Sequence, residues 1–283
     1  MWELMGYSDR KLPVTTTMPP GLEINIPQSH QLLQFVQNDS IPLTPAVAQM
    51  LQQQATPCLT LNSLLETTFS NDIYRGILTV SGQNTSIVAK MPHCDGDIEG
   101  SVFDLREEAM MYSGVLALFQ GEVVPLFYGL YEGQMGGRHL ACIVLEDCGD
   151  PHYGDIRDLD LPTKLVTLAI QSSLNFISIV RLTIYEKYHT LHKDAHIIHQ
   201  NAESLHILLS RSPEGGYDVR IISLRCITQD HECEWSVTPS PDKFRPDEGV
   251  FCGELFFLVE ELGIWDNRTI PPPSVIFSLL TQS

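Results

Sequence analysis

A lysine and a glutamate in the first half of the chain have the types and the spacing of a phosphate-binding pair. Lys90 ends the run Ser86-Ile87-Val88-Ala89-Lys90, and Glu108 follows about 18 residues later in a segment with helical periodicity. A cation and a carboxylate on a strand and the next helix can meet at a phosphate site. The same pair could instead only orient two elements, because it does not hold a nucleotide by itself without a metal. Both interpretations stay open.

Four histidines in the second half have a spacing that would suit a metal site on one helix face. They fall at i, i+3, i+7 and i+10: His189, His192, His196 and His199. This arrangement requires the helix to continue through Ile197-Ile198, whose β-branched residues favour a strand. We therefore expect packing and solvent-facing roles for these imidazoles.

The cysteines do not form a recognisable metal or disulfide pattern. Cys226, Cys233 and His231 have the ligand types of zinc but lack a fourth ligand, so no metal site is assigned. The seven cysteines are an odd number without a C-x-x-C pair, which favours reduced thiols. The first residues, Met-Trp-Glu-Leu-Met-Gly, show no secretory signal. A cytoplasmic or nuclear protein is expected, not a secreted one.

Composition excludes two classes of partner. The chain has 283 residues, and 17 Lys and Arg stand against 35 Asp and Glu, for a formal net charge of −18. Such a surface repels nucleic acid and anionic membranes. The longest uncharged stretch, Leu165 to Val180, is too short and too polar for a bilayer core of about 30 Å. A protein partner, unidentified, remains compatible with this charge.

The pattern before residue 149 predicts strands with one inserted helix. The runs Ile73–Val80 and Ser86–Lys90 flank a turn containing Gly82 and read as a hairpin. A helix is expected from about Val102 to Leu118, and two further strands follow at Val123–Tyr131 and His139–Leu145.

The second half is predicted to be mostly helical. Pro162 to Thr190 is long enough for one or two helices, and Val250–Leu262 is a last apolar helix. Between them, Ile207–Leu209 and Tyr217–Leu224 read as a hairpin. The Pro-rich start of the chain reads as an arm with short helices around Gln28–Val36 and Pro45–Gln54.

The order of these elements resembles the two-lobed protein-kinase-like fold, an α+β class. Val88-Ala89-Lys90 resembles the Val-Ala-Ile-Lys strand, whose lysine holds the nucleotide phosphates, and Glu108 stands at its partner position. Leu145-Glu146-Asp147-Cys148-Gly149 resembles the hinge, whose backbone groups bind an adenine edge. The resemblance thus implies ATP as ligand, with Glu146 and Cys148 beside it.

The resemblance also divides the chain. It implies an antiparallel N-lobe sheet with one helix over residues 61–148 and a truncated, mostly helical C-lobe over 149–265. An N-terminal arm covers 1–60 and a Pro-containing tail covers 266–283. Within about Leu64 to Gly263, the chain is similar to the short, divergent kinase-like proteins of mushroom-forming fungi.

Three positions depart from the family pattern. The stretch Leu191–Leu209 has the layout of the catalytic loop His-Arg-Asp-Leu-x-x-x-Asn, with His199 at its first position. Asn201 then replaces the catalytic Asp, and His206 replaces the metal-binding Asn. Ser223 stands where the metal-binding Asp of Asp-Phe-Gly is expected.

A second alignment of this loop starts at His192-Lys193-Asp194 and would supply an acid. It fails because no apolar strand follows it, whereas Ile207-Leu208-Leu209 follows the frame at His199.

These departures predict a pseudokinase. Mg²⁺ prefers carboxylate oxygen in octahedral geometry, and a serine and a neutral histidine do not supply it, so Mg²⁺ is not expected. An amide is not a base near neutral pH, so Asn201 cannot accept a hydroxyl proton. The expected function is an interaction or nucleotide-sensing module. The alternative is a divergent ATP-dependent phosphotransferase in which Asp194 or Asp230 takes over.

Overall fold

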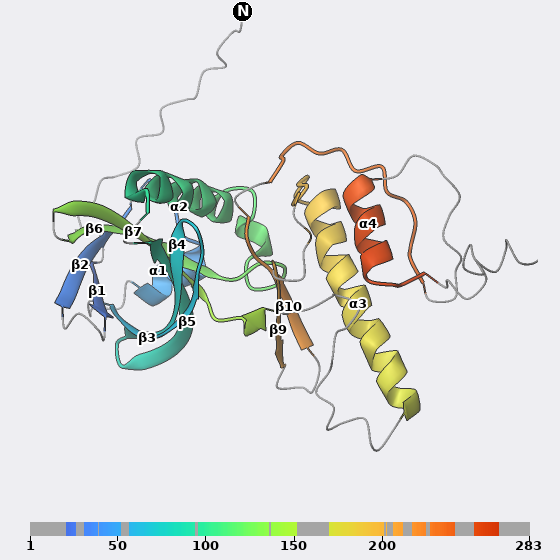
Figure 1. Ribbon diagram of the computed structural model, residues 1–283, viewed down its shortest axis with the longest axis horizontal. Helices are drawn as coiled ribbons and strands as arrows, with labels where there is room; N and C mark the ends of the chain where they lie inside the picture. Colours follow the sequence, from blue (N-terminus) through green and yellow to red (C-terminus); the bar gives the residue numbers. More distant parts are fainter. Residues whose placement is uncertain are drawn as a thin grey trace, which may run out of the picture.

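The computed structural model is of the α+β class (Figure 1). It describes residues 21–26, 31–38, 40–51, 57–93, 96–135, 137–151, 170–200, 202, 206–211, 217–224, 227–240 and 252–265.

Seven strands form a closed barrel in the order β1-β2-β6-β7-β5-β4-β3. Neighbouring strands are antiparallel except β1 and β3, which run parallel and close the barrel. Their bounds are β1 Gly21–Ile26, β2 Gln31–Gln37, β3 Cys58–Thr67, β4 Asn71–Val80, β5 Gln83–Pro92, β6 Phe127–Met135 and β7 Arg138–Glu146.

The β4–β5 hairpin follows directly from its turn chemistry. Ser81 and Gly82 connect the strands, with φ angles of 50° and 79°. Two successive positive φ angles are those of the two-residue turn that matches the twist of antiparallel strands. The hairpin prediction is confirmed, and it brings Lys90 to the end of β5.

The helix predicted around Gln28–Val36 is wrong. Gln31–Gln37 forms strand β2, which pairs with β1 and with β6. Part of the expected arm therefore belongs to the barrel. The second predicted helix is confirmed as α1, Pro45–Leu51.

Helix α2, Ile98–Ser113, packs on the barrel next to β6 and β7. It begins at Asp97, whose side chain accepts a hydrogen bond from the Gly100 N–H at 3.0 Å, a regular N-cap. Leu105, Ala109 and Tyr112 lie at helical spacing and are fully buried. Their burial directs the adjacent Glu108 toward the barrel.

Among the described residues, the second part contains two helices and a small sheet. Helix α3 spans Ile170–Lys193 and helix α4 spans Gly253–Glu261. The sheet has the order β10-β9-β8, and Figure 1 shows its strands between the barrel and the two helices. Its strands are β8 Asp150–Pro151, β9 Ile207–Arg211 and β10 Tyr217–Ile221, so the second hairpin prediction is also confirmed.

One core joins the two parts. A single cluster of buried side chains includes Tyr112 of α2, Phe127 of β6, Tyr188 of α3, Ile207 of β9 and Leu255 of α4. Tyr112 and Phe127 are stacked with ring centroids 5.6 Å apart. The barrel, the small sheet and the two helices therefore pack against one another through the same buried side chains.

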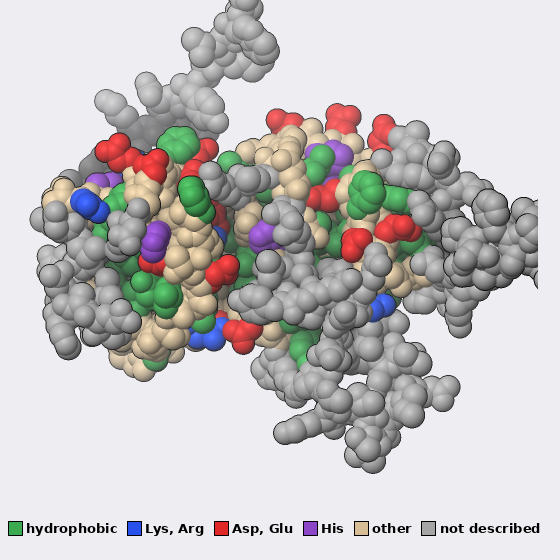
Figure 2. All heavy atoms as spheres, in the orientation of Figure 1, with side chains coloured by type: hydrophobic (Ala, Val, Ile, Leu, Met, Phe, Trp, Pro, Cys, Tyr) green, Lys and Arg blue, Asp and Glu red, His purple; other side chains and the backbone are tan. Residues whose placement is uncertain are grey.

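The surface agrees with the acidic composition. On the face drawn in Figure 2, red Asp and Glu side chains lie over both parts and blue ones are few. Among the described helices, none combines the length and the apolar character needed to cross a bilayer.

Candidate functional site

Lys90 and Glu108 meet as a buried ion pair. The Lys90 Nζ lies 2.6 Å from Glu108 Oε1, and the two side chains are 13% and 6% exposed. Lys90 comes from β5 and Glu108 from α2, so the pair fixes the helix against the barrel. A buried charge is tolerated only when it is paired, which explains why both groups lie together.

A cavity of about 260 Å³ opens beside Lys90. Its walls come from the barrel, from the segment after β7 and from the small sheet. The lining residues are Leu65, Glu66, Ile73, Val88, Lys90, Pro125, Leu145, Glu146, Gly149, Asp150, Leu208 and Ile222. Because most of these side chains are apolar, the cavity suits a flat apolar group with a charged end near Lys90.

Both residues expected at a hinge lie where β7 ends: Glu146 is its last residue, and Cys148 is in the segment after it. Glu146 lines the cavity, and its Oε2 accepts a hydrogen bond from the Leu126 N–H at 3.1 Å. Cys148 is buried, and its thiol lies 3.7 Å from the Glu146 carbonyl oxygen, to which it donates. Burial and the nearby Glu146 carboxylate raise the pKa of the Cys148 thiol. Cys148 therefore packs as a neutral thiol behind the cavity wall.

Gly149 allows this segment to approach the small sheet closely. Its φ of +95° is in the region that favours glycine, and an added Cβ would lie 2.5 Å from the Leu209 carbonyl oxygen. The close contact between the segment and β9 therefore depends on glycine.

Arg75 of β4 also binds the segment after β7, a contact that the sequence did not indicate. Its Nε lies 2.9 Å from Asp147 Oδ2 and its terminal nitrogen 2.8 Å from Asp150 Oδ1. Hydrogen bonding to Asp150 raises the pKa of Arg75 further. Two residues of the segment are thus tied to the barrel.

His199 anchors the loop that resembles a catalytic loop. It is fully buried, and its backbone N–H donates to Glu254 Oε2 at 2.9 Å. Its Nε2 donates to the Ile222 carbonyl oxygen at 2.8 Å. Since Ile222 lines the cavity, His199 connects the loop to the cavity wall.

The structure brings His206 and Ser223, two of the three divergent positions, near each other through a contact of His206 with Ile222, the residue before Ser223. The His206 ring lies 5.8 Å from the His199 ring, and the His206 carbonyl accepts from the Ile222 N–H at 2.9 Å. Ser223, next in the chain, has a φ of 66°. Asn201 lies outside the described residues.

Three carboxylates line the cavity, Glu66, Glu146 and Asp150, and two of them already have a hydrogen-bond or ion-pair partner. Asp150 pairs with Arg75, and Glu146 accepts from a backbone amide. Asp194 and Asp230, the two alternative acids, are exposed and are not among the residues that line the cavity. The geometry gives neither of them a position beside Lys90.

The sequence offered two separate groups of possible ligands, the four histidines from His189 to His199 and the set Cys226, Cys233 and His231, of which Cys226 lies outside the described residues. The structure instead gathers His192, His231, Cys233 and Cys252 into one cluster away from Lys90. Cys252, the residue before α4, had not been considered as a ligand.

Comparison with known proteins does not assign the chain to a family. No protein-family model matches the chain, and no curated protein matches it either.

Proposed function

We propose that this chain is a two-lobed, kinase-like protein that binds an adenine nucleotide without Mg²⁺ and does not transfer phosphate. The observation that carries the proposal is the Lys90–Glu108 ion pair at the edge of an apolar cavity. In protein kinases the corresponding lysine and glutamate must be paired for the nucleotide phosphates to be held. The barrel would be one lobe, and the small sheet with α3 and α4 the other.

The size of the cavity supports binding of a nucleotide base. Whole-ligand sites usually measure about 300–1,000 Å³, whereas this cavity measures about 260 Å³. A purine would lie between Val88 of the barrel and Leu208 of the small sheet, which are both lining residues. The backbone of the Glu146–Gly149 segment would be the edge that the base contacts.

The phosphates would extend toward Lys90. Its ammonium group is a compact cation with three donors, and Glu108 occupies one side of it at 2.6 Å. The remaining donors can contact phosphate oxygens. This single cation is the reason to expect modest affinity.

Loss of the metal-binding groups supports the absence of transfer. Phosphoryl transfer in kinases needs a metal-binding aspartate and asparagine, and this chain has Ser223 and His206 at those positions. Neither is a ligand that Mg²⁺ prefers. With Asn201 in place of the base, the protein would sense nucleotide or present a surface to a protein partner.

Thermal unfolding of the full chain with ATP tests this proposal. At a concentration of about 100 Kd, bound ATP contributes about 2.7 kcal/mol, which raises Tm by roughly 5–10 °C. The shift should be the same with added Mg²⁺ and in buffer without Mg²⁺. Transfer of the γ-phosphate to the chain itself or to a general substrate should be absent.

The variants must separate binding from folding. Lys90→Ala leaves Glu108 buried and unpaired, so it can fail to fold. The double variant Lys90→Met/Glu108→Leu removes both charges and should fold but lose the ATP shift. An unchanged shift in this variant would exclude the cavity as the site. No shift in the natural protein would leave only a nucleotide-free interaction module, and Mg²⁺-dependent transfer would establish an active enzyme; either result overturns the proposal.

A further inference from the structure

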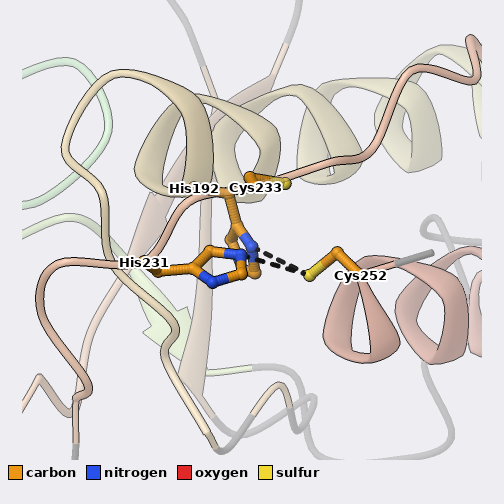
Figure 3. A group of neighbouring side chains, drawn as sticks. All are labelled: His192, His231, Cys233 and Cys252. Atoms are coloured by element: carbon orange, nitrogen blue, oxygen red, sulfur yellow. Dashed lines mark hydrogen bonds between the residues drawn. The ribbon is translucent and has the colours of Figure 1, made fainter. Parts of the chain in front are cut away.

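Four side chains with zinc-binding atoms converge in the second part of the molecule (Figure 3). His192 lies in the last turn of α3, His231 and Cys233 lie in the segment 227–240, and Cys252 immediately precedes α4. One donor atom from each lies within 4.8 Å of all the others. His192 and Cys252 are buried, and the other two are half-buried.

Two of the distances between the donor atoms are close to the edge length of a zinc tetrahedron. Zn–S bonds of about 2.3 Å and Zn–N bonds of about 2.0–2.1 Å place sulfur and nitrogen roughly 3.5 Å apart in tetrahedral geometry. The His192 Nδ1 lies 3.2 Å from the Cys252 Sγ, and the His231 Nε2 lies 3.6 Å from it. Figure 3 shows both rings directing these nitrogens at the sulfur. The Cys233 Sγ lies within 4.8 Å of the other three donor atoms, so it would move toward them to complete the tetrahedron.

We propose that His192, His231, Cys233 and Cys252 bind one structural Zn²⁺ ion. Two thiolates and two imidazoles form the Cys₂His₂ set that is typical of closed, four-coordinate zinc sites. All four positions are filled by protein, so the ion would have no place for a reacting water. Its role would be to hold the structure together.

A carboxylate behind His192 is an independent sign of a metal site. Glu254 Oε2 lies 2.5 Å from His192 Nε2, the ring nitrogen that does not face the cluster. Zinc-binding histidines commonly donate their second N–H to a carboxylate, which fixes the tautomer and the orientation of the ring. Here Nε2–H donates to Glu254, so Nδ1 carries the lone pair that points to Cys252.

Charge favours an ion at this place. Zn²⁺ with two thiolates and two neutral imidazoles has no net charge, so a partly buried site is not penalised by an unpaired ion.

The ion would add a link to α4 to the contacts that residues 227–240 already make with α3 and with the loop after it. Among these, Trp235 Nε1 donates to the Tyr185 hydroxyl oxygen at 2.9 Å, and Thr228 pairs with Ile198 through two backbone hydrogen bonds. Residues 227–240 contain no helix or strand. Their described contacts with α3 include Lys193 Nζ donating to the Cys233 carbonyl at 2.6 Å. A zinc ion would fix this segment to both α3 and α4. Glu254 also accepts from the His199 N–H, so the site would be connected to the loop beside the cavity.

Metal analysis of the full chain, purified without added chelator, tests the proposal. Elemental analysis should find about one zinc per chain. The metal-free protein, reduced and supplied with Co²⁺, should show the visible d–d bands of tetrahedral cobalt and a thiolate-to-cobalt charge-transfer band. Added Zn²⁺ should abolish both.

Matched variants locate the site. Cys252→Ser and His192→Gln should lose the metal and the cobalt bands. Cys58→Ser and His189→Gln change the same residue types outside the cluster and should retain both. Glu254→Gln should keep the metal with an affinity lower by about 10–100-fold.

Two results would overturn the proposal. One is natural protein that contains no metal, takes up neither Co²⁺ nor Zn²⁺ when reduced, and forms a Cys233–Cys252 disulfide on oxidation. The other is equal metal content in the Cys252→Ser and Cys58→Ser proteins. If Cys252→Ser fails to fold, metal content and the cobalt spectrum of the natural protein still decide.

Discussion

Two buried carboxylates, one in each part of the molecule, make a useful comparison. Glu108 of α2 pairs with Lys90 of β5 at 2.6 Å, and Glu254 of α4 pairs with His192 of α3 at 2.5 Å. Both side chains are largely buried, at 6% and 9% exposed. Each joins a helix to another element, but the surroundings of the two pairs differ.

The difference lies in what else holds each part together. Around Glu108 the backbone is organised by a closed barrel, whose strand pairs supply hydrogen bonds along their length. The Lys90 ammonium can therefore serve a ligand without endangering the barrel. Around Glu254 the chain includes an irregular segment, and His192 there faces three further zinc-type donors. We infer that the barrel leaves its polar pair available for binding, whereas the second part uses its polar cluster for stability.

The largest expected effect comes from breaking the first pair. Lys90→Ala should lower the free energy of unfolding by about 3–5 kcal/mol, because it leaves the buried Glu108 carboxylate without its cation. Urea unfolding followed by tryptophan fluorescence measures the change. Lys90→Met/Glu108→Leu is the control and should lose much less, since no unpaired charge remains. Equal losses in both proteins would contradict this account of the pair.

Gly149→Ala tests the junction between the two parts. The substitution should cost about 1–3 kcal/mol, because alanine disfavours the positive φ and its Cβ would meet the Leu209 carbonyl at 2.5 Å. Thermal unfolding measures it. Gly82→Ala also has a positive φ but nothing within 4 Å of the added Cβ, so it isolates the backbone contribution. A larger loss at Gly82 than at Gly149 would speak against a close contact at the junction.

Removal of the proposed zinc ion should speed amide exchange in the second part of the molecule but not in the barrel. Chelation by EDTA should speed amide exchange in α4 at least about tenfold, which corresponds to about 1.4 kcal/mol of local opening free energy. Amides of β4 and β5 should exchange as before, because barrel hydrogen bonds protect them. Hydrogen exchange with mass spectrometry separates these peptides. Uniform acceleration over the whole chain would show that the parts do not differ in this way.

The smallest effect concerns an ion pair between α2 and barrel strand β6, Arg106–Glu132. Hydrogen bonds from Arg106 Nε and Asn38 to Glu132 lower the pKa of that carboxyl group to about 2, although burial opposes them. The stabilisation is present above the ordinary pKa of 4.5 and is lost as the pH falls toward 2. Because Arg106 is 43% exposed, the contribution is only about 1 kcal/mol.

Glu132→Gln is the corresponding variant. Urea unfolding at pH 7 and again near pH 3 should show a smaller loss of stability on acidification than in the natural protein. An identical pH dependence of stability in the two proteins would exclude Glu132 as a cause of the stability lost on acidification.

Local patterns were sufficient to predict many of the elements. The β4–β5 hairpin has a turn signal between β-branched runs, and α2 has an apolar stripe at helical spacing, so neighbouring residues determine both. Strand β2 was missed because Leu32, Leu33, Phe35 and Val36 also fit a helix face. Short apolar runs cannot be assigned by periodicity alone. Its pairing with β6 joins residues far apart in the chain.

The two candidate sites also differ in how far they can be predicted from local sequence patterns. Lys90 and Glu108 belong to adjacent elements, so their spacing predicted a contact that the structure contains. His192 and Cys252 are 60 residues apart and come together only after α3 and α4 pack. No local spacing indicates such a cluster, and the fold alone adds His192 and Cys252 to His231 and Cys233.

Calorimetric titration of ATP into the full chain in buffer without Mg²⁺ and without chelator tests the central claim most directly. We expect one saturable site, with the same Kd after Mg²⁺ is added and with no binding by Lys90→Met/Glu108→Leu. Binding that appears only with Mg²⁺, accompanied by release or transfer of the γ-phosphate, would contradict it.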